Sequence, residues 1–180
     1  MIPSFLHSGD KPPQPIAAVP SPPHFQAPLL PVERAIFSKR ASQQSGTTAA
    51  QKSGLRYEAK VQRELDSRYG KRYFPSKHIH FRDQRGWNTA VPDGLLCGFE
   101  WVAVIEIKSQ HMPESWWQLR RKYEPVVRVL LPHDRIILVE ICRALDKDMP
   151  YPERFDLIEE LDKFLEHAPD GSLGVLQWRL

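Results

Sequence analysis

Apolar and polar positions recur along residues 53–180 with the periods of both helices and strands. The segment 55–70 has the spacing of an amphipathic helix, and Gly70 at its end suits a helix C-cap. The apolar runs at 101–108 and 134–141 are dense enough to predict buried central strands. Weaker strand patterns, the last with the character of an edge strand, cover 77–81, 89–96 and 174–178.

Two further segments have helical periodicity. The first covers 113–131, where Pro125 is expected to kink or divide the helix, and the second covers 155–168. The predicted order is therefore a helix, three strands, a helix, a strand, a helix and a strand. An order of this kind implies an α/β fold in which helices pack on the faces of a mixed central sheet.

Residues 1–52 differ in composition from the rest of the chain. Nine of the 17 prolines lie within 3–31, and the stretch 41–53 is polar without an apolar period. Such a sequence does not bury enough apolar surface to order itself, so we interpret 1–52 as a Pro-rich disordered tail with one short helix around residues 31–39. The tail is either a simple leader or an arm that binds DNA or a protein partner, and its basic residues after the prolines are Arg34, Lys39 and Arg40.

The composition narrows the function only a little. A net charge of +3 and a pI near 8.9 are compatible with a nucleic-acid partner but do not require one. The two cysteines are far apart and have no CxxC spacing, so we expect neither a disulfide framework nor a zinc ribbon. No stretch reaches the roughly 18 apolar residues that span a bilayer, and the N-terminus lacks a secretory signal pattern. We therefore expect a cytoplasmic protein with no membrane partner.

Two short motifs carry the strongest chemical signal, Pro-Asp-Gly at 92–94 and Glu-Ile-Lys at 106–108. Side chains alternate along a strand, so Glu106 and Lys108 share one face of an otherwise apolar strand. A charge buried there needs a partner or a metal ion, and an ion pair between these two residues satisfies that need by itself. Asp93, expected at the end of a neighbouring strand, adds a second carboxylate. Two hard oxygen ligands suit Mg2+, with Mn2+ able to substitute.

Two more polar residues are candidate members of this site. Glu58 falls on the apolar face of the first predicted helix, beside Val61 and Leu65, where an acid needs an explanation. Gln110, two residues after Lys108, is placed to contact water or phosphate, and a solvated strand end is the alternative. A metal ion held here would polarise a phosphodiester and lower the pKa of a bound water, with Lys108 orienting that water or stabilising the transition state.

The motifs and the order of elements resemble the PD-(D/E)XK nuclease superfamily, which has a restriction-endonuclease-like fold with an αβββαβ core. In that family the acidic motifs lie on the second and third strands, and the first helix often supplies a further acid, which corresponds to Glu58. The local pattern Gly-x-x-x-Glu at 54–58 is similar to a helix of Holliday-junction resolvases and phage nucleases. The resemblance implies that Asp93 and Glu106 hold the metal together with Glu58, that the Ile107 carbonyl is an additional ligand, and that Lys108 assists the water.

Basic and aromatic residues outside these motifs are candidates for contact with DNA. Arg82, Arg85 and Trp87 form a loop ahead of the first acidic motif, and this loop is our main candidate for reaching a DNA groove or its phosphates. Trp117 and Arg121 lie together on the side of their helix away from the apolar face, where they would stack on a base or pack against a partner subunit. An ordinary solvated surface is the alternative for both groups.

Other patterns carry less chemical information. Arg56, Lys60 and Arg63 form a basic stripe on the first predicted helix, which we interpret as a solvated face. The histidines, including His111, lack the spacing of three or four zinc ligands. The chain contains neither GxxxxGK[ST] nor GxGxxG, so an ATPase motor or a dinucleotide-dependent enzyme is unsupported.

The sequence as a whole predicts a Mg2+-dependent deoxyribonuclease that hydrolyses phosphodiester bonds. The family resemblance implies a role in phage or mobile-element biology or in DNA repair or recombination. One alternative of the same class is a Holliday-junction resolvase-type endonuclease, which would act as a homodimer. Alternatives of other classes are a non-catalytic nucleic-acid-binding module on the nuclease fold and an assembly protein whose tail binds a partner.

Overall fold

The computed structural model describes residues 31–37, 49–132, 134–146 and 150–180, with side chains described from residue 52 onward in the first helix. The helical elements are α1 (Ala49–Tyr69), η1 (Gly70–Arg72), α2 (Pro113–Trp117), η2 (Gln118–Tyr123), α3 (Glu124–Leu130) and α4 (Ile158–His167). The strands are β1 (Arg34–Phe37), β2 (Tyr73–Pro75), β3 (Ile79–Asp83), β4 (Gly86–Ala90), β5 (Gly94–Cys97), β6 (Trp101–Gln110), β7 (Arg135–Ala144), β8 (Arg154–Phe155) and β9 (Leu173–Gln177).

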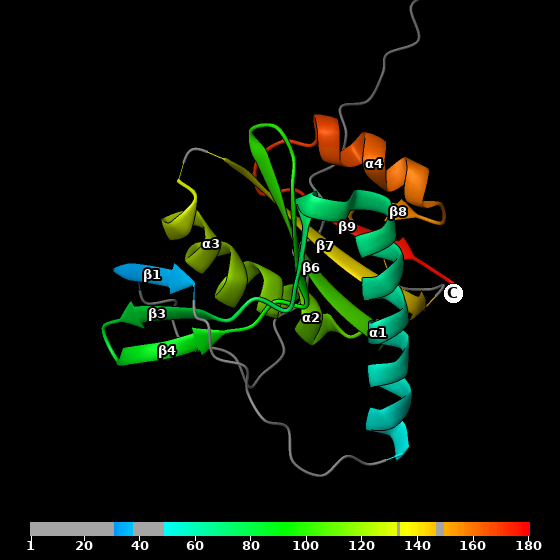
Figure 1. Ribbon diagram of the computed structural model, residues 1–180, viewed down its shortest axis with the longest axis horizontal. Coiled ribbons are helices and arrows are strands. Elements are labelled where there is room, and N and C mark those ends of the chain that lie inside the picture. Colours follow the sequence, from blue (N-terminus) through cyan, green and yellow to red (C-terminus); the bar gives the residue numbers. More distant parts are fainter. Residues whose placement is uncertain (1–30, 38–48, 133, 147–149) are drawn as a thin grey trace, which may run out of the picture.

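A six-stranded mixed sheet with the order β2-β5-β6-β7-β9-β8 forms the centre of the molecule (Figure 1). Strand β5 runs antiparallel to β2 and β6, whereas β6, β7, β9 and β8 are parallel to one another. The long strands β6 and β7 occupy the middle because their apolar residues are buried on both faces, as is usual for parallel strands. The predicted α/β class, a mixed sheet flanked by helices, is confirmed.

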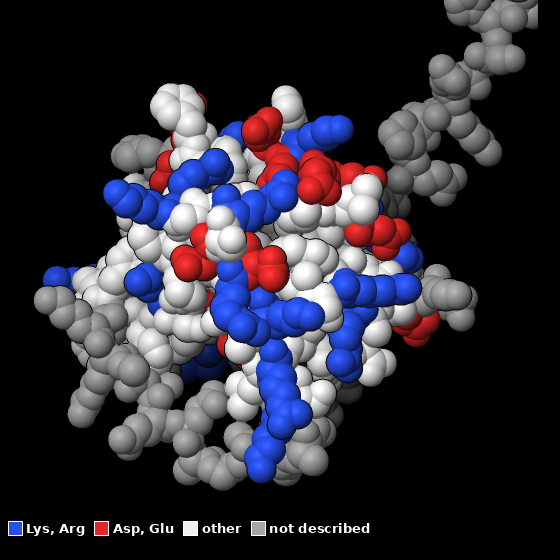
Figure 2. All heavy atoms as spheres, turned by 45° about the vertical axis from the view of Figure 1, so that its right-hand side comes forward, with Lys and Arg blue, Asp and Glu red and all other residues white. Residues whose placement is uncertain are grey.

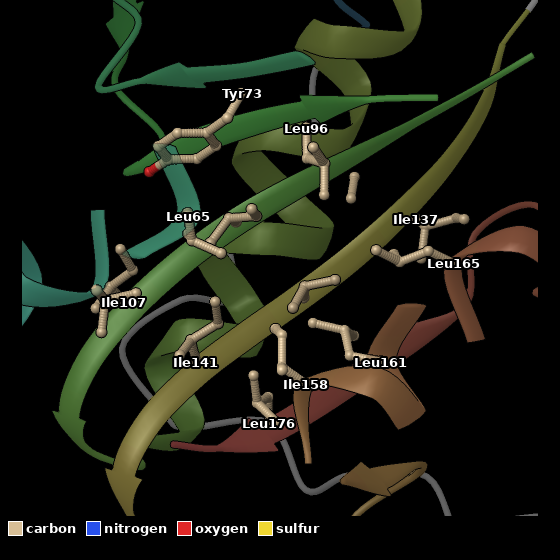
Figure 3. Close-up of a cluster of buried hydrophobic side chains, with 14 of the residues drawn as sticks. Leu65, Tyr73, Leu96, Ile107, Ile137, Ile141, Ile158, Leu161, Leu165 and Leu176 are labelled. Carbon is tan, nitrogen blue, oxygen red and sulfur yellow. The ribbon is translucent and has the colours of Figure 1, made fainter. Parts of the chain in front are cut away.

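Each face of the sheet is covered by its own set of helices. Alternate residues of β6, including Ile105 and Ile107, pack with α1 and α4, and Figure 3 shows Leu65, Ile141 and Leu161 within this cluster. The intervening residues, including Val104, pack with α2, η2 and α3 in a second cluster. Glu106 belongs by alternation to the second face, so it points into an apolar layer.

The first predicted helix is confirmed and begins earlier than expected, at Ala49. It ends at Tyr69, and the next residue, Gly70, has a φ of 53° in the left-handed region that glycine adopts without strain. The predicted strands at 101–108 and 134–141 are confirmed as β6 and β7. In the helical segment 113–131 the division expected near Pro125 is also present, because the π-helical turn η2 directly precedes α3.

Three strand predictions were wrong in detail. The segment 89–96 is not one strand, because Pro92 lacks a backbone donor and β4 ends before it while β5 begins after it. The segment 77–81 contributes β3 to a separate antiparallel sheet with the order β1-β3-β4, and the strand beside β5 is instead the unpredicted β2. Strand β9 is not at the edge, since β8 pairs with its outer side.

The part of the predicted tail at 1–30 and 38–48 lies outside the described residues. In the described part, the short helix expected around residues 31–39 is wrong, because β1 pairs antiparallel with β3 and makes strand hydrogen bonds instead. Within the described ranges, no helix combines the length and the apolar character needed to cross a membrane.

Gly94 provides a test of packing beside the acidic motif. A Cβ added at this position would lie 2.6 Å from a ring carbon of Tyr73, which is buried. We expect Gly94→Ala to lower the free energy of unfolding by about 1–3 kcal/mol, measured by urea denaturation. Gly54→Ala in α1 is the matched control, because no atom lies within 4 Å of the added methyl group, and it should stabilise the protein slightly. Equal effects of the two substitutions would contradict this account.

Candidate active site

Asp93 lies beside Glu106 where β5 meets β6. The register pairs Gly94 with Ile105, so the residues just before and just after that pair are neighbours across the two strands. The Asp93 carboxylate accepts a hydrogen bond from the backbone N–H of Ile107, with 2.7 Å between N and Oδ2. This bond fixes one acid against the strand that carries the other.

Glu106 and Lys108 form an ion pair on one face of β6. The Lys108 Nζ lies 2.6 Å from Glu106 Oε1, and the glutamate side chain is 3% exposed while the lysine side chain is 32% exposed. The second carboxylate oxygen, Glu106 Oε2, is buried and has no hydrogen-bond partner among the described residues. Five other buried atoms among the described residues also lack a partner, and Glu140 Oε1 and His111 Nε2 are two of them. Such atoms are uncommon in folded proteins, so Glu106 Oε2 is an oxygen available to a ligand.

Burial and the neighbouring Lys108 act in opposite directions on the pKa values of Asp93 and Glu106. Burial raises the pKa of the Asp93 carboxyl, while the Ile107 N–H and the nearby Lys108 act in the other direction. Burial also raises the pKa of Glu106, and the negative charge of Asp93 adds to that rise. Two carboxylates that repel each other in a largely buried place favour a cation between them.

Glu58 approaches this pair from α1. Burial, and then the negative charge of Asp93, raise the pKa of Glu58 from 4.5 to about 7, while Lys108 lowers it. Gln62, one turn later on the same helix, donates a hydrogen bond to Glu58 Oε1 at 3.1 Å and another to the Asp93 carbonyl at 3.3 Å. The sequence analysis missed Gln62, although its position four residues after Glu58 places it on the same side of the helix.

A second buried pair, also missed by the sequence analysis, lies next to the site. Glu140 of β7 stands directly opposite Glu106 in the parallel register, and its Oε2 is 2.7 Å from His111 Nδ1. The side chains of Glu140 and His111 are 0% and 2% exposed. His111, whose spacing from the other histidines does not identify a zinc site, therefore binds a carboxyl group. The detectable signal was an acid at the centre of an apolar strand, which is the pattern that identified Glu106.

The other predicted site residues make no hydrogen bond or ion pair with these carboxylates among the described residues. Gln110 is exposed at the end of β6, and its side chain makes no hydrogen bond within the described residues. Arg82 and Trp87 belong to β3 and β4 of the small sheet, with Arg85 in the turn between them. Arg82 lies 3.5 Å from Glu33, and Trp87 is 55% exposed.

Trp117 and Arg121 contact each other as predicted, with the guanidinium carbon 4.3 Å from the centre of a Trp117 ring. They line a pocket of about 860 Å³ together with Phe164 and Pro169. The lining of this pocket includes none of the residues Glu58, Asp93, Glu106 and Lys108. Trp117 and Arg121 therefore line a pocket to which the carboxylates do not contribute.

A metal ion at this site would need oxygen atoms that are not already held by hydrogen bonds. In the part of the chain that the structure describes, no three His, Cys, Asp or Glu side chains are already arranged to hold an ion. Asp93 and Glu106 supply carboxylates from neighbouring strands, and the unpartnered Glu106 Oε2 fits a hard cation. Glu58 directs Oε1 to Gln62, so it flanks these two acids and is not a ready-made third ligand.

The buried pair beside the site should make a measurable contribution to stability. His111→Leu leaves the Glu140 carboxyl buried without its partner, which is expected to lower the free energy of unfolding by about 3–5 kcal/mol. The double variant H111L/E140L removes both polar groups and should recover most of this loss. Urea denaturation of the three proteins measures the difference. If the double variant were less stable than His111→Leu, the unpaired Glu140 carboxyl would not be the cause of the stability lost in the single variant.

The raised pKa of Glu58 predicts a pH dependence of stability. The folded protein holds a proton on Glu58 up to about pH 7, whereas the ordinary pKa is 4.5, so wild-type stability should fall as the pH rises between these values. Glu58→Gln removes this loss, so its melting temperature should rise relative to wild type between pH 4.5 and 7. Glu64→Gln, an exposed acid of the same helix, controls for the loss of a negative charge. A constant difference between Glu58→Gln and wild type across this range would refute the assignment.

No protein-family model, curated protein or solved structure matches this chain. A function for the site therefore follows from its own chemistry: two opposed carboxylates, a lysine bound to one of them, a third acid on α1 and a buried oxygen without a partner.

Proposed function

We propose that this chain is a metal-dependent nuclease that hydrolyses DNA phosphodiester bonds at Asp93, Glu106 and Lys108, with Glu58 beside them. One observation carries the proposal. The buried Glu106 carboxylate and the half-buried Asp93 carboxylate lie together, Lys108 Nζ is 2.6 Å from Glu106 Oε1, and Glu106 Oε2 has no partner among the described residues. A simple ion pair accounts for Lys108 and Glu106 but gives no reason for Asp93, a second and half-buried acid, at the same place.

The order of elements supports the proposal. Helix α1, strands β2, β5 and β6, the helical segment α2–α3 and strand β7 follow one another along the chain, and the four strands are adjacent in the order β2-β5-β6-β7. This is the arrangement expected of the αβββαβ core of PD-(D/E)XK nucleases, with the acidic motifs at its second and third strands. Strands β3 and β4 are then an insertion between the first two strands of that core.

The metal that fits this site best is Mg2+, with Mn2+ as a substitute. Asp93 and Glu106 would hold it through carboxylate oxygens, with the Ile107 carbonyl as a further oxygen ligand. A bound ion of this kind polarises the phosphodiester and neutralises the charge that develops during displacement.

The residues of the chain have distinct roles in the proposed reaction. Lys108 Nζ keeps one N–H on Glu106 Oε1 and directs others toward a phosphate oxygen or the attacking water. Glu58 Oε1 is occupied by Gln62, which leaves Oε2 to take a proton from that water. A group whose pKa is about 7 is suited to this task near neutral pH, because a useful fraction is ionised and still basic.

In the reaction, the oxygen of a water molecule forms a bond to phosphorus while the bond from phosphorus to one ester oxygen breaks. One proton of the water passes to Glu58, and the departing ester oxygen gains a proton from solvent. The products are one DNA end with a phosphate and one with a hydroxyl group.

The proposal predicts metal-dependent cleavage of labelled DNA. Purified protein should cut duplex, single-stranded, circular or four-way-junction DNA with Mg2+ or Mn2+ and not with EDTA. Asp93→Asn and Lys108→Met should each reduce the rate by at least about 100-fold. Lys71→Met and Glu64→Gln, which change exposed residues away from the site, are matched controls and should leave the rate unchanged.

The substrate that is cut best would separate the alternatives. Preference for the four-way junction would indicate a resolvase-type endonuclease. Absence of cutting under all conditions, with DNA still bound equally by wild type and Asp93→Asn, would refute the catalytic proposal in favour of a binding module.

A further inference from the structure

Helix α1 carries a row of cations along its outer side. Lys52, Arg56, Lys60 and Arg63 recur at intervals of three or four residues, and all four are exposed. At about 100° per residue they fall within a sector of about 80°, on the side of the helix opposite the buried Val61. Their row spans about 16 Å along the axis at about 1.5 Å per residue.

These cations have no acidic partner among the described residues, whereas several arginines elsewhere on the surface do. Arg68 pairs with Asp162, and both Arg128 and Arg154 also pair with carboxylates. In contrast, none of the four cations of α1 has a carboxylate within ion-pair distance among the described residues, and Arg63 bonds only to the Ala59 carbonyl of its own helix. Figure 2 shows blue side chains along the lower half of α1, whereas blue and red mix elsewhere on this face.

Two further cations extend the row across the ends of the parallel strands. The Tyr57 hydroxyl on α1 donates to the Trp178 carbonyl at 2.8 Å, which places Arg179 near this helix. Arg143 at the end of β7 is close enough for its charge to act on the same hydroxyl. Neither arginine has a carboxylate partner among the described residues. We call Lys52, Arg56, Lys60, Arg63, Arg143 and Arg179 the basic face.

The basic face adjoins the candidate active site. Tyr57 and Glu58 are consecutive residues of α1. Tyr57 contacts the chain just after β9 through the Trp178 carbonyl, and Glu58 lies near enough to Asp93 and Lys108 for their charges to change its pKa. Lys108 pairs in register with Cys142, so Arg143 follows at the same edge of the sheet as Lys108. A ligand that covers the basic face therefore reaches the carboxylates across the width of one helix.

We infer that the phosphate backbone of duplex DNA binds along the basic face and thereby brings the scissile phosphate to Asp93 and Glu106. The inference rests on the proposed nuclease function. Six unpaired cations complement a polyanion, and the 16 Å length of the row matches about five base pairs at about 3.4 Å each. Contacts of this kind fix the position of the duplex and carry no sequence preference. The stripe on α1, interpreted from the sequence as a solvated face, is thus a surface for binding substrate.

Binding can be tested without cleavage. Fluorescence anisotropy of a labelled duplex in EDTA, repeated over a series of salt concentrations, gives the slope of log K against log salt. We expect Arg56→Gln, Lys60→Gln and Arg143→Gln each to weaken binding and to reduce the magnitude of this slope by about 0.9, the value for one lost phosphate contact. Thermal denaturation of each variant verifies that it is folded.

Lys71→Gln and Lys163→Gln are the matched controls, because they remove the same charge from exposed residues outside the basic face. The slope and affinity of these controls should equal those of wild type. An equal decrease in the controls would show an effect of net charge alone and would overturn the inference, as would unchanged binding by the three basic-face variants.

The two proposals can fail separately. Normal cleavage and normal binding by the basic-face variants would overturn the binding surface and leave the nuclease function standing. Salt-dependent binding lost only in the basic-face variants, by a wild-type protein that never cuts DNA, would support the binding surface and overturn the nuclease function.

Discussion

Two glutamates lie side by side in the middle of an apolar sheet, and the need of each for a bonding partner constrains the residues around it. Glu106 and Glu140 stand opposite each other on the long parallel strands β6 and β7. A buried carboxyl is costly unless it is bonded, and each here has its own partner, Lys108 for one and His111 for the other. The rest of the site is arranged around the first of these pairs, and the buried ring cluster of His111 and Trp116 around the second.

Elements with a long and regular pattern were predictable from the sequence. A continuous apolar face is buried in the helices α1 and α4, and a continuous apolar run in the strands β6 and β7. The hydrophobic period of each element is therefore visible in the sequence whichever element packs against it. The strands β2 and β8 were missed because three and two residues are too few to establish an alternation. The segment 31–39 was misjudged as helical because pairing with β3, a contact distant in sequence, decides its conformation.

The same limit applies to the candidate site. Strand alternation and amphipathicity were sufficient to select Asp93, Glu106 and Lys108 and to mark Glu58 as an acid on an apolar face. Sequence alone gives no register between strands, so it did not show that Glu140 lies beside Glu106 or that His111, 29 residues away, binds it. Gln62 was overlooked because it donates to the backbone carbonyl of Asp93, and the position of a backbone carbonyl relative to a helix cannot be predicted from the identity of any side chain.

The way in which Asp93 is anchored has a consequence for how this sequence is free to vary. Its carboxylate is bound by the peptide N–H of Ile107, a group that every amino acid except proline carries. The Ile107 side chain lies on the face of the sheet opposite Glu106, where it packs with residues of α1 and α4. One apolar residue at position 107 can therefore replace another without loss of the hydrogen bond to Asp93, because the donor is the backbone N–H and is present in any sequence that keeps this fold.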